Sequence, residues 1–297
     1  MEYLSYCPLC EEGEKPARFL DCPDHLLGTS NYSMVKCNSC HHIYTNPRPF
    51  EKDLEKFYKS QKYISHTEQA SSFRDYLYFR VRAYMLGRKA KLIRKLNIPN
   101  HRLLDVGCGT GAFLKKMEES HFQVIGVEPN MSASKMAIEK GLQVFENQQY
   151  IKEIGENSLG VITLWHVLEH QPDFMQGLQQ YFTLLIPGGW LVVAVPQHQS
   201  FDAGFYRQYW AAYDLPRHLH HFSFETLLLA CRKNGFAFRK KIGMPFDAFY
   251  VALLSEQFKG TPLGAVRAIL VAAWSNLLAL LRVRPWSSQI FIFQKSF

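Results

Sequence analysis

The strongest chemical signal in the sequence is a glycine-rich loop that follows an apolar segment ending in an acid. The run from Leu103 to Gly111 reads LLDVGCGTG, with the acid at Asp105. Glycines at this spacing allow a sharp turn and let the main chain approach a ligand closely, because they carry no Cβ atom. A loop of this kind between a strand and a helix is typical of sites that bind nucleotide-containing cofactors.

Two acids indicate which cofactor this loop favours. Asp105 stands directly before the glycines, where its charge would repel a pyrophosphate but attract an ammonium or a sulfonium group. Glu128 closes the next apolar segment, 122–127, where a carboxylate can accept hydrogen bonds from both ribose hydroxyls. A dinucleotide fingerprint would read Gly-x-Gly-x-x-Gly/Ala. Ala112 could fill its last place, so the glycine spacing alone does not separate the two kinds of cofactor.

The two segments resemble motif I and the following acidic motif of the class I S-adenosylmethionine-dependent methyltransferases, with LLDVGCGTG and VIGVEPN in these places. The resemblance implies that S-adenosylmethionine is held by the two acids and by the loop, that is by Asp105, Gly107, Cys108, Gly109, Gly111 and Glu128. It also implies that the segment TLWHVLEH, 163–170, leaves the fourth strand and cups the methionine end of the cofactor with its backbone, at Leu164, Trp165 and His166.

Candidates for a base lie in the segments 163–170 and 202–221. The second segment resembles the substrate segment of sugar C-methyltransferases, and His218 matches the catalytic histidine of that family. Leu215 and Arg217 stand where the family has Tyr and Glu, so part of its base machinery is missing. We expect His218 to be the catalytic base.

Further residues of these segments are expected to serve the acceptor. His170 and His221 are alternative bases, although His170 with Glu169 could equally be a capping pair that only holds the loop. The expected substrate-binding residues are Tyr213, Asp214 and Arg217, with Arg217 bound to an anionic group such as a phosphate.

Two Cys-x2-Cys pairs near the N-terminus form a separate signal. Cys7 with Cys10, and Cys37 with Cys40, provide four thiolates on two tight turns, a set that suits tetrahedral Zn²⁺. Four sulfur ligands leave no open coordination position, so the zinc is expected to be structural. Cys22, His41 and His42 could act as substitute ligands. The sugar C-methyltransferases also carry a four-cysteine zinc module.

The elements that must position these residues alternate between strands and helices. Strands are expected at 102–106, 122–127, 142–145, 159–164 and 190–195, with helices at 112–119, 131–139 and 173–184, and the run LIPGG at 185–189 is expected to be a turn. This alternation predicts a doubly wound parallel sheet with ligands at the carboxyl ends of its strands. A helix at 224–233 and strands at 236–243 and 289–293 complete seven strands. The resemblance implies a Rossmann-like methyltransferase fold whose last strand is antiparallel.

The chain is expected to have three parts. A zinc-ribbon module spans 1–50, a helical connector that covers the cofactor site spans 51–100, and the methyltransferase domain spans 101–297 with a helical insertion at about 245–285. Within 265–284 lies an uncharged run that is too short to span a bilayer comfortably. It could lie in a membrane interface, meet a second subunit or cap the fold. The oligomeric state is left open.

Composition gives weaker constraints. The 297 residues carry 34 Lys and Arg against 26 Asp and Glu, a net charge of +8, which favours an anionic partner. The zinc module has nearly balanced charge, which speaks against nucleic acid as that partner. The N-terminus shows no signal-peptide pattern, so a cytoplasmic location is expected. The predicted function is methyl transfer to a small anionic acceptor, such as a nucleotide-linked or lipid-linked sugar. The alternatives are an RNA or protein methyltransferase and a cofactor-binding scaffold without turnover.

Overall fold

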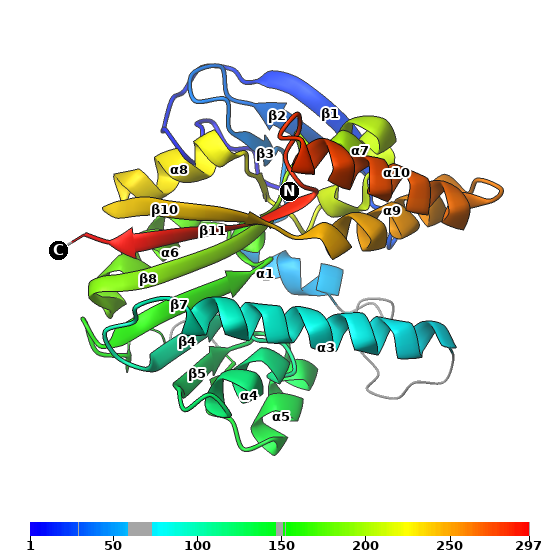
Figure 1. The fold of residues 1–297 in the computed structure, drawn as a ribbon. Coiled ribbons are helices and arrows are strands. Elements are labelled where there is room, and N and C mark those ends of the chain that lie inside the picture. Colours follow the sequence, from blue (N-terminus) through cyan, green and yellow to red (C-terminus); the bar gives the residue numbers. More distant parts are fainter. Residues whose placement is uncertain (29, 59–72, 147–150, 152, 297) are drawn as a thin grey trace.

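The computed structural model of the chain describes all residues except 29, 59–72, 147–150, 152 and 297. Its larger sheet has seven strands in the order β10-β11-β8-β7-β4-β5-β6 (Figure 1). These strands are β4 (Arg102–Val106), β5 (Gln123–Val127), β6 (Val144–Phe145), β7 (Leu159–Trp165), β8 (Leu185–Pro196), β10 (Phe236–Gly243) and β11 (Ser288–Lys295).

Pairing within this sheet confirms the predicted fold class. Strands β4, β5, β6, β7 and β8 pair in parallel, and β11 is antiparallel to both β8 and β10. The helices that connect and cover them are α3 (Phe73–Arg94), α4 (Ala112–Glu118), α5 (Met131–Glu139), α6 (Phe174–Leu184) and α8 (Phe224–Lys233). The observed architecture is the mostly parallel, Rossmann-like sheet expected from the sequence.

Alternating strand residues divide the core between the two faces of the sheet. Leu104 and Leu164 face a cluster that includes residues of α6 and α8, whereas Leu103 and Val161 face a cluster that includes residues of α3 and α4. Because side chains alternate along a strand, Asp105 lies on the same face as Leu103, the face covered by α3. The face that carries the acid of the glycine loop is therefore fixed by the apolar residues around it.

Strand β8 differs from the sequence prediction at its start. Residues 185–189 were expected to form a turn before the fifth strand, but they belong to β8 itself. Leu159 of β7 pairs with Leu185, whereas Val161 pairs with Trp190, so the extra residues form an irregularity in the ladder. Gly188 has a φ of 74° there, which explains why glycine occupies this position.

The N-terminal residues form a second sheet of four strands in the order β1-β2-β3-β9. Strands β1 (Ala17–Pro23), β2 (Asn31–Lys36) and β3 (Ile43–Thr45) come from the cysteine-bearing module, and β9 (His220–His221) comes from a distant segment that precedes α8. Ile43 pairs with His221 and Tyr44 with His220. The N-terminal module therefore shares a sheet with the segment that carries the candidate base His218.

Short helices follow the N-terminal module and strand β8. After the N-terminal module come α1 (Glu51–Leu54) and η1 (Glu55–Tyr58). After β8 come α7 (Phe201–Tyr206), η4 (Arg207–Tyr209) and η5 (Ala211–Tyr213). Part of the expected connector, residues 59–72, lies outside the described residues.

Two helices lie between β10 and β11, where the sequence predicted an insertion. These are α9 (Pro245–Lys259) and α10 (Gly264–Leu280), which pack against each other and against α7. Figure 1 shows the pair on the side of the molecule opposite α4 and α5. Across the described residues, no helix combines the length and the apolar character that a bilayer crossing requires.

Candidate active site

The glycine loop joins the end of β4 to the start of α4. Gly107, Gly109 and Gly111 have φ values of 70°, 55° and 76°, which favour glycine. A Cβ atom on Gly107 would come within 2.4 Å of Val167, whereas one on Gly109 would meet nothing within 4 Å. Gly109 therefore borders open space, and its main chain is accessible to a ligand from that space. The Cys108 thiol is buried in the core beside α4, where it donates a 3.8 Å hydrogen bond to the Gly109 carbonyl.

Asp105 is buried beneath this loop and is held by the neighbouring strand. Thr163 of β7 lies opposite Asp105 in the ladder, and its hydroxyl donates a 2.6 Å hydrogen bond to Oδ1 of Asp105. Burial raises the pKa of Asp105 to about 7, although the Thr163 bond and the charge of Lys89 act against the shift. A buried carboxyl group of this kind gains from a cation beside it, which is what a cofactor with an ammonium group provides.

Glu128 follows β5 and orders the main chain around the loop. One carboxylate oxygen accepts a 2.8 Å hydrogen bond from the Gly109 amide, and the other accepts a 2.9 Å bond from the Asn130 amide. Each carboxylate oxygen has two lone pairs, so both can still accept from ribose hydroxyls. The open face of Gly109, the buried acid Asp105 and the carboxylate of Glu128 together fit S-adenosylmethionine, which brings a cation and a ribose.

The three residues expected at the methionine end of the cofactor lie in different environments. Leu164 points into the α6 side of the sheet, so its side chain does not face the loop. Trp165 lies on the α3 side, with its ring 5.3 Å from that of Phe113 and 4.4 Å from the Lys89 ammonium. Its buried indole Nε1 has no hydrogen-bond partner among the described residues, which leaves a donor for a ligand.

His166 lies between two carboxylates. Its Nε2 is 3.2 Å from Oδ2 of Asp247 on α9, and its Nδ1 is 3.5 Å from Oε1 of Glu169. Burial opposes a charge on the ring, but the contacts with Asp247 and Glu169 outweigh burial and raise the pKa of His166 to about 9. His166 is therefore an imidazolium at neutral pH, and it ties α9 to the carboxyl end of β7.

Glu169 and the two histidines His170 and His218 form a compact group close to His166. The potential ligand atoms of Glu169, His170 and His218 all lie within 4.8 Å of one another. Glu169 is only 1% exposed, and neither of its carboxylate oxygens has a hydrogen-bond partner among the described residues; the 3.5 Å contact with His166 is an ion pair. Burial would raise the pKa of Glu169, but the neighbouring histidines lower it, so the carboxylate is charged.

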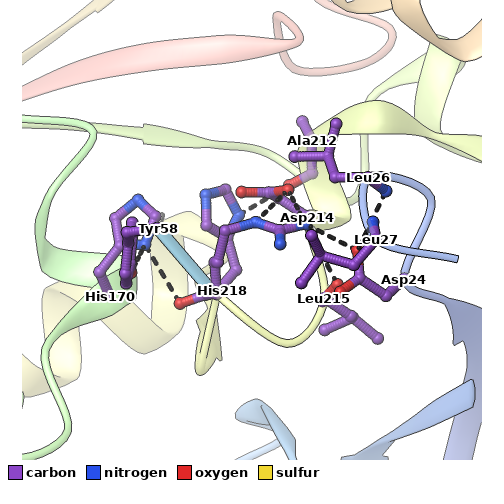
Figure 2. Close-up of polar contacts among 10 residues, drawn as sticks. Asp24, Leu26, Leu27, Tyr58, His170, Ala212, Asp214, Leu215 and His218 are labelled. Atoms are coloured by element: carbon purple, nitrogen blue, oxygen red, sulfur yellow. Dashed lines mark hydrogen bonds and ion pairs between the residues drawn. The ribbon is translucent and has the colours of Figure 1, made fainter. Parts of the chain in front are cut away.

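The ring orientations of the two histidines are set by main-chain carbonyls. Nδ1 of His218 lies 2.9 Å from the carbonyl of Ala212, and Nδ1 of His170 lies 3.1 Å from the carbonyl of Arg217 and 2.9 Å from the Tyr58 hydroxyl (Figure 2). A carbonyl accepts only, so each Nδ1 donates and each Nε2 is left as an acceptor. Burial lowers the pKa of His170 to about 4, so this ring is neutral. With Glu169, this arrangement suits either proton transfer or a divalent cation.

A small cavity of about 10 Å³, with room for about one water molecule, lies beside this group. It is lined by Glu169, Val195, Pro196, His198, Trp210, Ala212, His218, His220, His221 and Phe222. His221, an alternative base, also lines the cavity, and its Nε2 is 3.4 Å from the Thr45 hydroxyl. Burial holds the pKa of His221 well below its usual value. Tyr213 packs edge-on against the rings of Trp210 and His221. The structure thus brings His218, His170 and His221 together and places Tyr213 next to them.

Arg217 differs from its expected role as an anion-binding residue. Its guanidinium is 1% exposed and lies 2.7 Å from a carboxylate oxygen of Asp214 and 3.2 Å from one of Asp24. Burial opposes its charge, but Asp214 and Asp24 raise the pKa of Arg217 further. Because Asp24 belongs to the N-terminal module, this ion-pair network joins that module to the segment that carries His218. Because its guanidinium is paired with these two carboxylates, Arg217 is not available to bind an anionic acceptor.

The four predicted zinc ligands lie together. Cys7 Sγ is 3.5 Å from Cys40 Sγ, Cys10 Sγ is 3.6 Å from Cys37 Sγ, and all four sulfur atoms lie within 4.8 Å of one another. Sulfur atoms in a tetrahedral site with Zn–S bonds of about 2.3 Å are about 3.8 Å apart, so the donor set fits Zn²⁺. Cys22 lies in β1 and is not part of this cluster.

Several contributors to the site were not singled out from the sequence. Thr163, Tyr58 and Asp247 each contact a predicted site residue, namely Asp105, His170 and His166. A polar residue in the middle of the apolar strand 159–165 was a signal for Thr163. The other two contacts join segments about 80 to 110 residues apart. For Asp247 the sequence indicated only that the segment 245–250 could return to the cleft, and for Tyr58 no local pattern indicates the contact.

Comparisons with known proteins place the chain among methyltransferases. Residues 71–241 match the model of a family described as "Methyltransferase domain". A curated relative from Leptothrix cholodnii, "Ubiquinone biosynthesis O-methyltransferase", is 26% identical over 160 residues, which are 49% of this chain and 68% of that protein. The protein of the same name from Nitrosospira multiformis is 30% identical over 105 residues, 33% of this chain and 44% of that protein. The chain thus spans about two thirds of one relative and less than half of the other.

Solved structures support the fold. A SAM-dependent methyltransferase from Archaeoglobus fulgidus has a TM-score of 0.51 and 19% identity, with 72% of this chain and 94% of that chain covered. At this identity the likeness concerns the arrangement of the sheet and its helices.

Proposed function

The chain belongs to the methyltransferase-domain family, and we propose that it transfers a methyl group from S-adenosylmethionine to a hydroxyl group of a small acceptor. The observation that carries the proposal is the buried group of Glu169, His170 and His218 beside a cavity at the carboxyl end of β7. The names of the curated relatives, which specify O-methyl transfer, support an oxygen as the methylated atom.

The proposed cofactor site uses the glycine loop and its two acids. Asp105 faces the ammonium group, Glu128 accepts from the ribose, and Gly109 gives the cofactor its open main chain. S-adenosylmethionine bound there supplies a methyl group on a positively charged sulfur. The reaction is then an in-line displacement, and most of the rate enhancement comes from holding the two substrates in the right geometry.

The proposed base is His218. Its Nε2 is the acceptor, because Nδ1 is committed to the Ala212 carbonyl. With S-adenosylmethionine bound, the acceptor hydroxyl would give its proton to Nε2 as its oxygen bonds to the methyl carbon, and the bond from that carbon to sulfur would break to release S-adenosylhomocysteine. The charged carboxylate of Glu169 would stabilise the imidazolium that forms. His170 stays neutral, and Tyr58 and the Arg217 carbonyl fix its ring. It serves as a positioning residue for His218, whose ring lies 4.5 Å away.

The side chains that line the cavity indicate which chemical groups the acceptor carries. Glu169 and the histidines His218, His220 and His221 are hydrogen-bonding partners suited to hydroxyl groups. A hydroxyl group of a nucleotide-linked or lipid-linked sugar meets this requirement and matches the small size of the cavity. The phosphates of such a sugar would have to lie outside the cavity, because Arg217 is paired and Glu169 is negative.

Zinc in this proposal has a structural role. A site with four cysteine ligands holds the turns at Cys7 and Cys37, and through β3 it supports β9 and the segment that carries His218.

Turnover of labelled S-adenosylmethionine over a panel of sugars, nucleotide sugars and phenols tests the proposal. We expect His218→Gln to lower turnover by about 10² to 10⁴-fold, as for loss of a general base. Its affinity for S-adenosylhomocysteine should stay within about twofold of the wild type, because His218 does not touch the cofactor loop. His101→Gln, a change at an exposed histidine, is the control. Equal turnover by His218→Gln and wild type would remove His218 from the mechanism.

A further inference from the structure

Helix α10 has two faces of different character. Its inner face consists of small residues, including Ala268, Ala272 and Ser275, and packs into the cluster that also contains residues of α9 and of 203–215. Ser275 donates a 2.7 Å hydrogen bond to the buried Asp202, and Asn276 donates one of 2.9 Å to the Pro245 carbonyl. These bonds fix the rotation of the helix, so its outer face cannot turn into the core.

The outer face of α10 is apolar throughout. Every exposed residue of this helix is apolar, namely Ala265, Val266, Ile269, Leu270, Ala273, Trp274, Leu277 and Leu280. The six larger side chains are between 42% and 67% exposed, and Leu281 and Val283 continue the surface at 64% and 62%. Helices on the surface of globular proteins normally carry charged residues on the outer face. A continuous apolar face of this length indicates a surface that is covered by a partner.

The exposed charged residues that flank this face in the sequence are basic. From Gln257 to Phe297 the sequence contains no Asp or Glu. Lys259 at the end of α9 is exposed, and Arg282 and Arg284 directly after α10 are exposed. Arg267 is neutralised by its 2.6 Å ion pair with Glu256. Uncompensated positive charge therefore stands at both ends of the apolar face.

We infer that the outer face of α10 lies in the surface of an anionic lipid bilayer, with its axis parallel to the membrane plane. Apolar side chains enter the boundary of the acyl chains, Trp274 lies at headgroup level, and Lys259, Arg282 and Arg284 meet lipid phosphates. A second copy of the chain fits less well, because both ends of the face are positive. A symmetric helix pair would bring like charges together in either orientation.

The position of α10 relative to the candidate site suggests how the membrane contact could serve the reaction. Helix α9, which packs along α10, carries Asp247, and Asp247 is paired with His166 at the end of β7. A hydroxyl acceptor anchored in the same bilayer would reach the site from the side of these helices. This use rests on the proposed function, whereas the lipid contact itself rests on α10 alone.

Vesicle binding by the full-length protein, without cofactor or acceptor, tests the inference. We expect cosedimentation with phosphatidylglycerol-containing vesicles and at least tenfold weaker binding to pure phosphatidylcholine vesicles. The double variant Leu270→Glu with Trp274→Glu should reduce binding at least tenfold. Arg282→Glu with Arg284→Glu should reduce binding to anionic vesicles and leave the weak phosphatidylcholine binding unchanged.

The control is Ile138→Glu, a change of an exposed apolar residue to the same acid on α5. It should bind vesicles like the wild type, and thermal unfolding should show that all variants are folded. Wild-type protein that binds neither kind of vesicle would overturn the inference. So would a wild-type dimer in solution that Leu270→Glu with Trp274→Glu converts to a monomer. Vesicle binding without any methyl transfer would overturn the proposed function alone.

Discussion

Thr163 and Asp105 face each other across strands β7 and β4, and the Thr163 hydroxyl donates a 2.6 Å hydrogen bond to Oδ1 of Asp105. This bond stabilises the charged form of a carboxyl group that is almost completely buried. The proposed cofactor site therefore depends on a partner that lies 58 residues away in the sequence.

Thr163→Val should weaken cofactor binding. Valine has nearly the same shape but cannot donate, so the pKa of Asp105 should rise further and less of the carboxylate is charged at neutral pH. A lost hydrogen bond to a charged group is worth about 1.5–3 kcal/mol, so we expect the Kd for S-adenosylhomocysteine at pH 7 to rise about tenfold or more. Thr163→Ser, which keeps the hydroxyl, is the control for calorimetry. An unchanged Kd for Thr163→Val would contradict this role.

Cofactor affinity should increase with pH around neutrality. Burial raises the pKa of Asp105 to about 7, so the group is protonated below this pH and charged above it. Because the charged form binds the ammonium group, the Kd for S-adenosylhomocysteine should fall between pH 6 and pH 8, and binding should release protons below pH 7. Asp105→Asn should bind weakly at both pH values. A wild-type Kd that is the same at pH 6 and pH 8 would exclude this titration.

The ion pair between Asp247 and His166 should contribute to stability only while the ring is charged. The folded-state pKa of His166 is raised to about 9, so its stabilisation is fully present below the unfolded pKa and is lost as the pH rises through 9. Asp247→Asn should lower the free energy of unfolding by about 1–2 kcal/mol at pH 6. Denaturant titrations at pH 6 and pH 9.5 should show this difference and then its loss. A difference of equal size at both pH values would mean that packing, not charge, is responsible.

Arg217 should behave as a structural residue. Arg217→Met removes the cation between Asp24 and Asp214 and leaves two carboxylates without it, a change that typically costs about 3–5 kcal/mol. We expect a large fall in thermal stability, which the triple change Asp24→Asn, Asp214→Asn and Arg217→Met should partly restore. A stable Arg217→Met protein that is impaired only in KM for an anionic acceptor would instead support an anion-binding role.

Loss of the cysteine cluster should reach the active site through β3 and β9. Cys37→Ser should lower the zinc content measured by mass spectrometry and reduce turnover, because His220 and His221 pair with strand residues of the zinc module. Affinity for S-adenosylhomocysteine should persist in any fraction that remains folded, since the glycine loop belongs to the other sheet. Cys231→Ala, at a buried cysteine outside the cluster, should keep its zinc. Full zinc content in Cys37→Ser would contradict the predicted ligand set.

The parts of the fold that were predictable from the sequence are those with local signals. The run 103–111 contains its own strand, turn and helix start, and the paired cysteines contain their own ligand spacing, so both could be located without a structure. The alternation of strands and helices then gave the parallel sheet, and the last strand is antiparallel as the resemblance implied.

The remainder of the candidate site depends on contacts between distant segments. Arg217 contacts Asp24, which lies 193 residues away in the sequence, and a two-residue strand, β9, joins the N-terminal module to the segment of His218. Neither has a local pattern, so the sequence suggested a free cation where the structure has a buried ion-pair network. Asp202 is similar, because its hydrogen bonds with Trp210, Ser275 and Ser287 make it part of the core in a segment that reads as a polar loop.

The central claim is that the glycine loop with Asp105 and Glu128 holds S-adenosylmethionine, and calorimetry tests it most directly. Titration of the full-length protein at pH 8 with S-adenosylhomocysteine should give one site per chain, and titration with NAD should give no binding heat. Asp105→Ala should abolish the first signal without changing the zinc content. Saturable binding of NAD together with no response to S-adenosylhomocysteine would contradict the account.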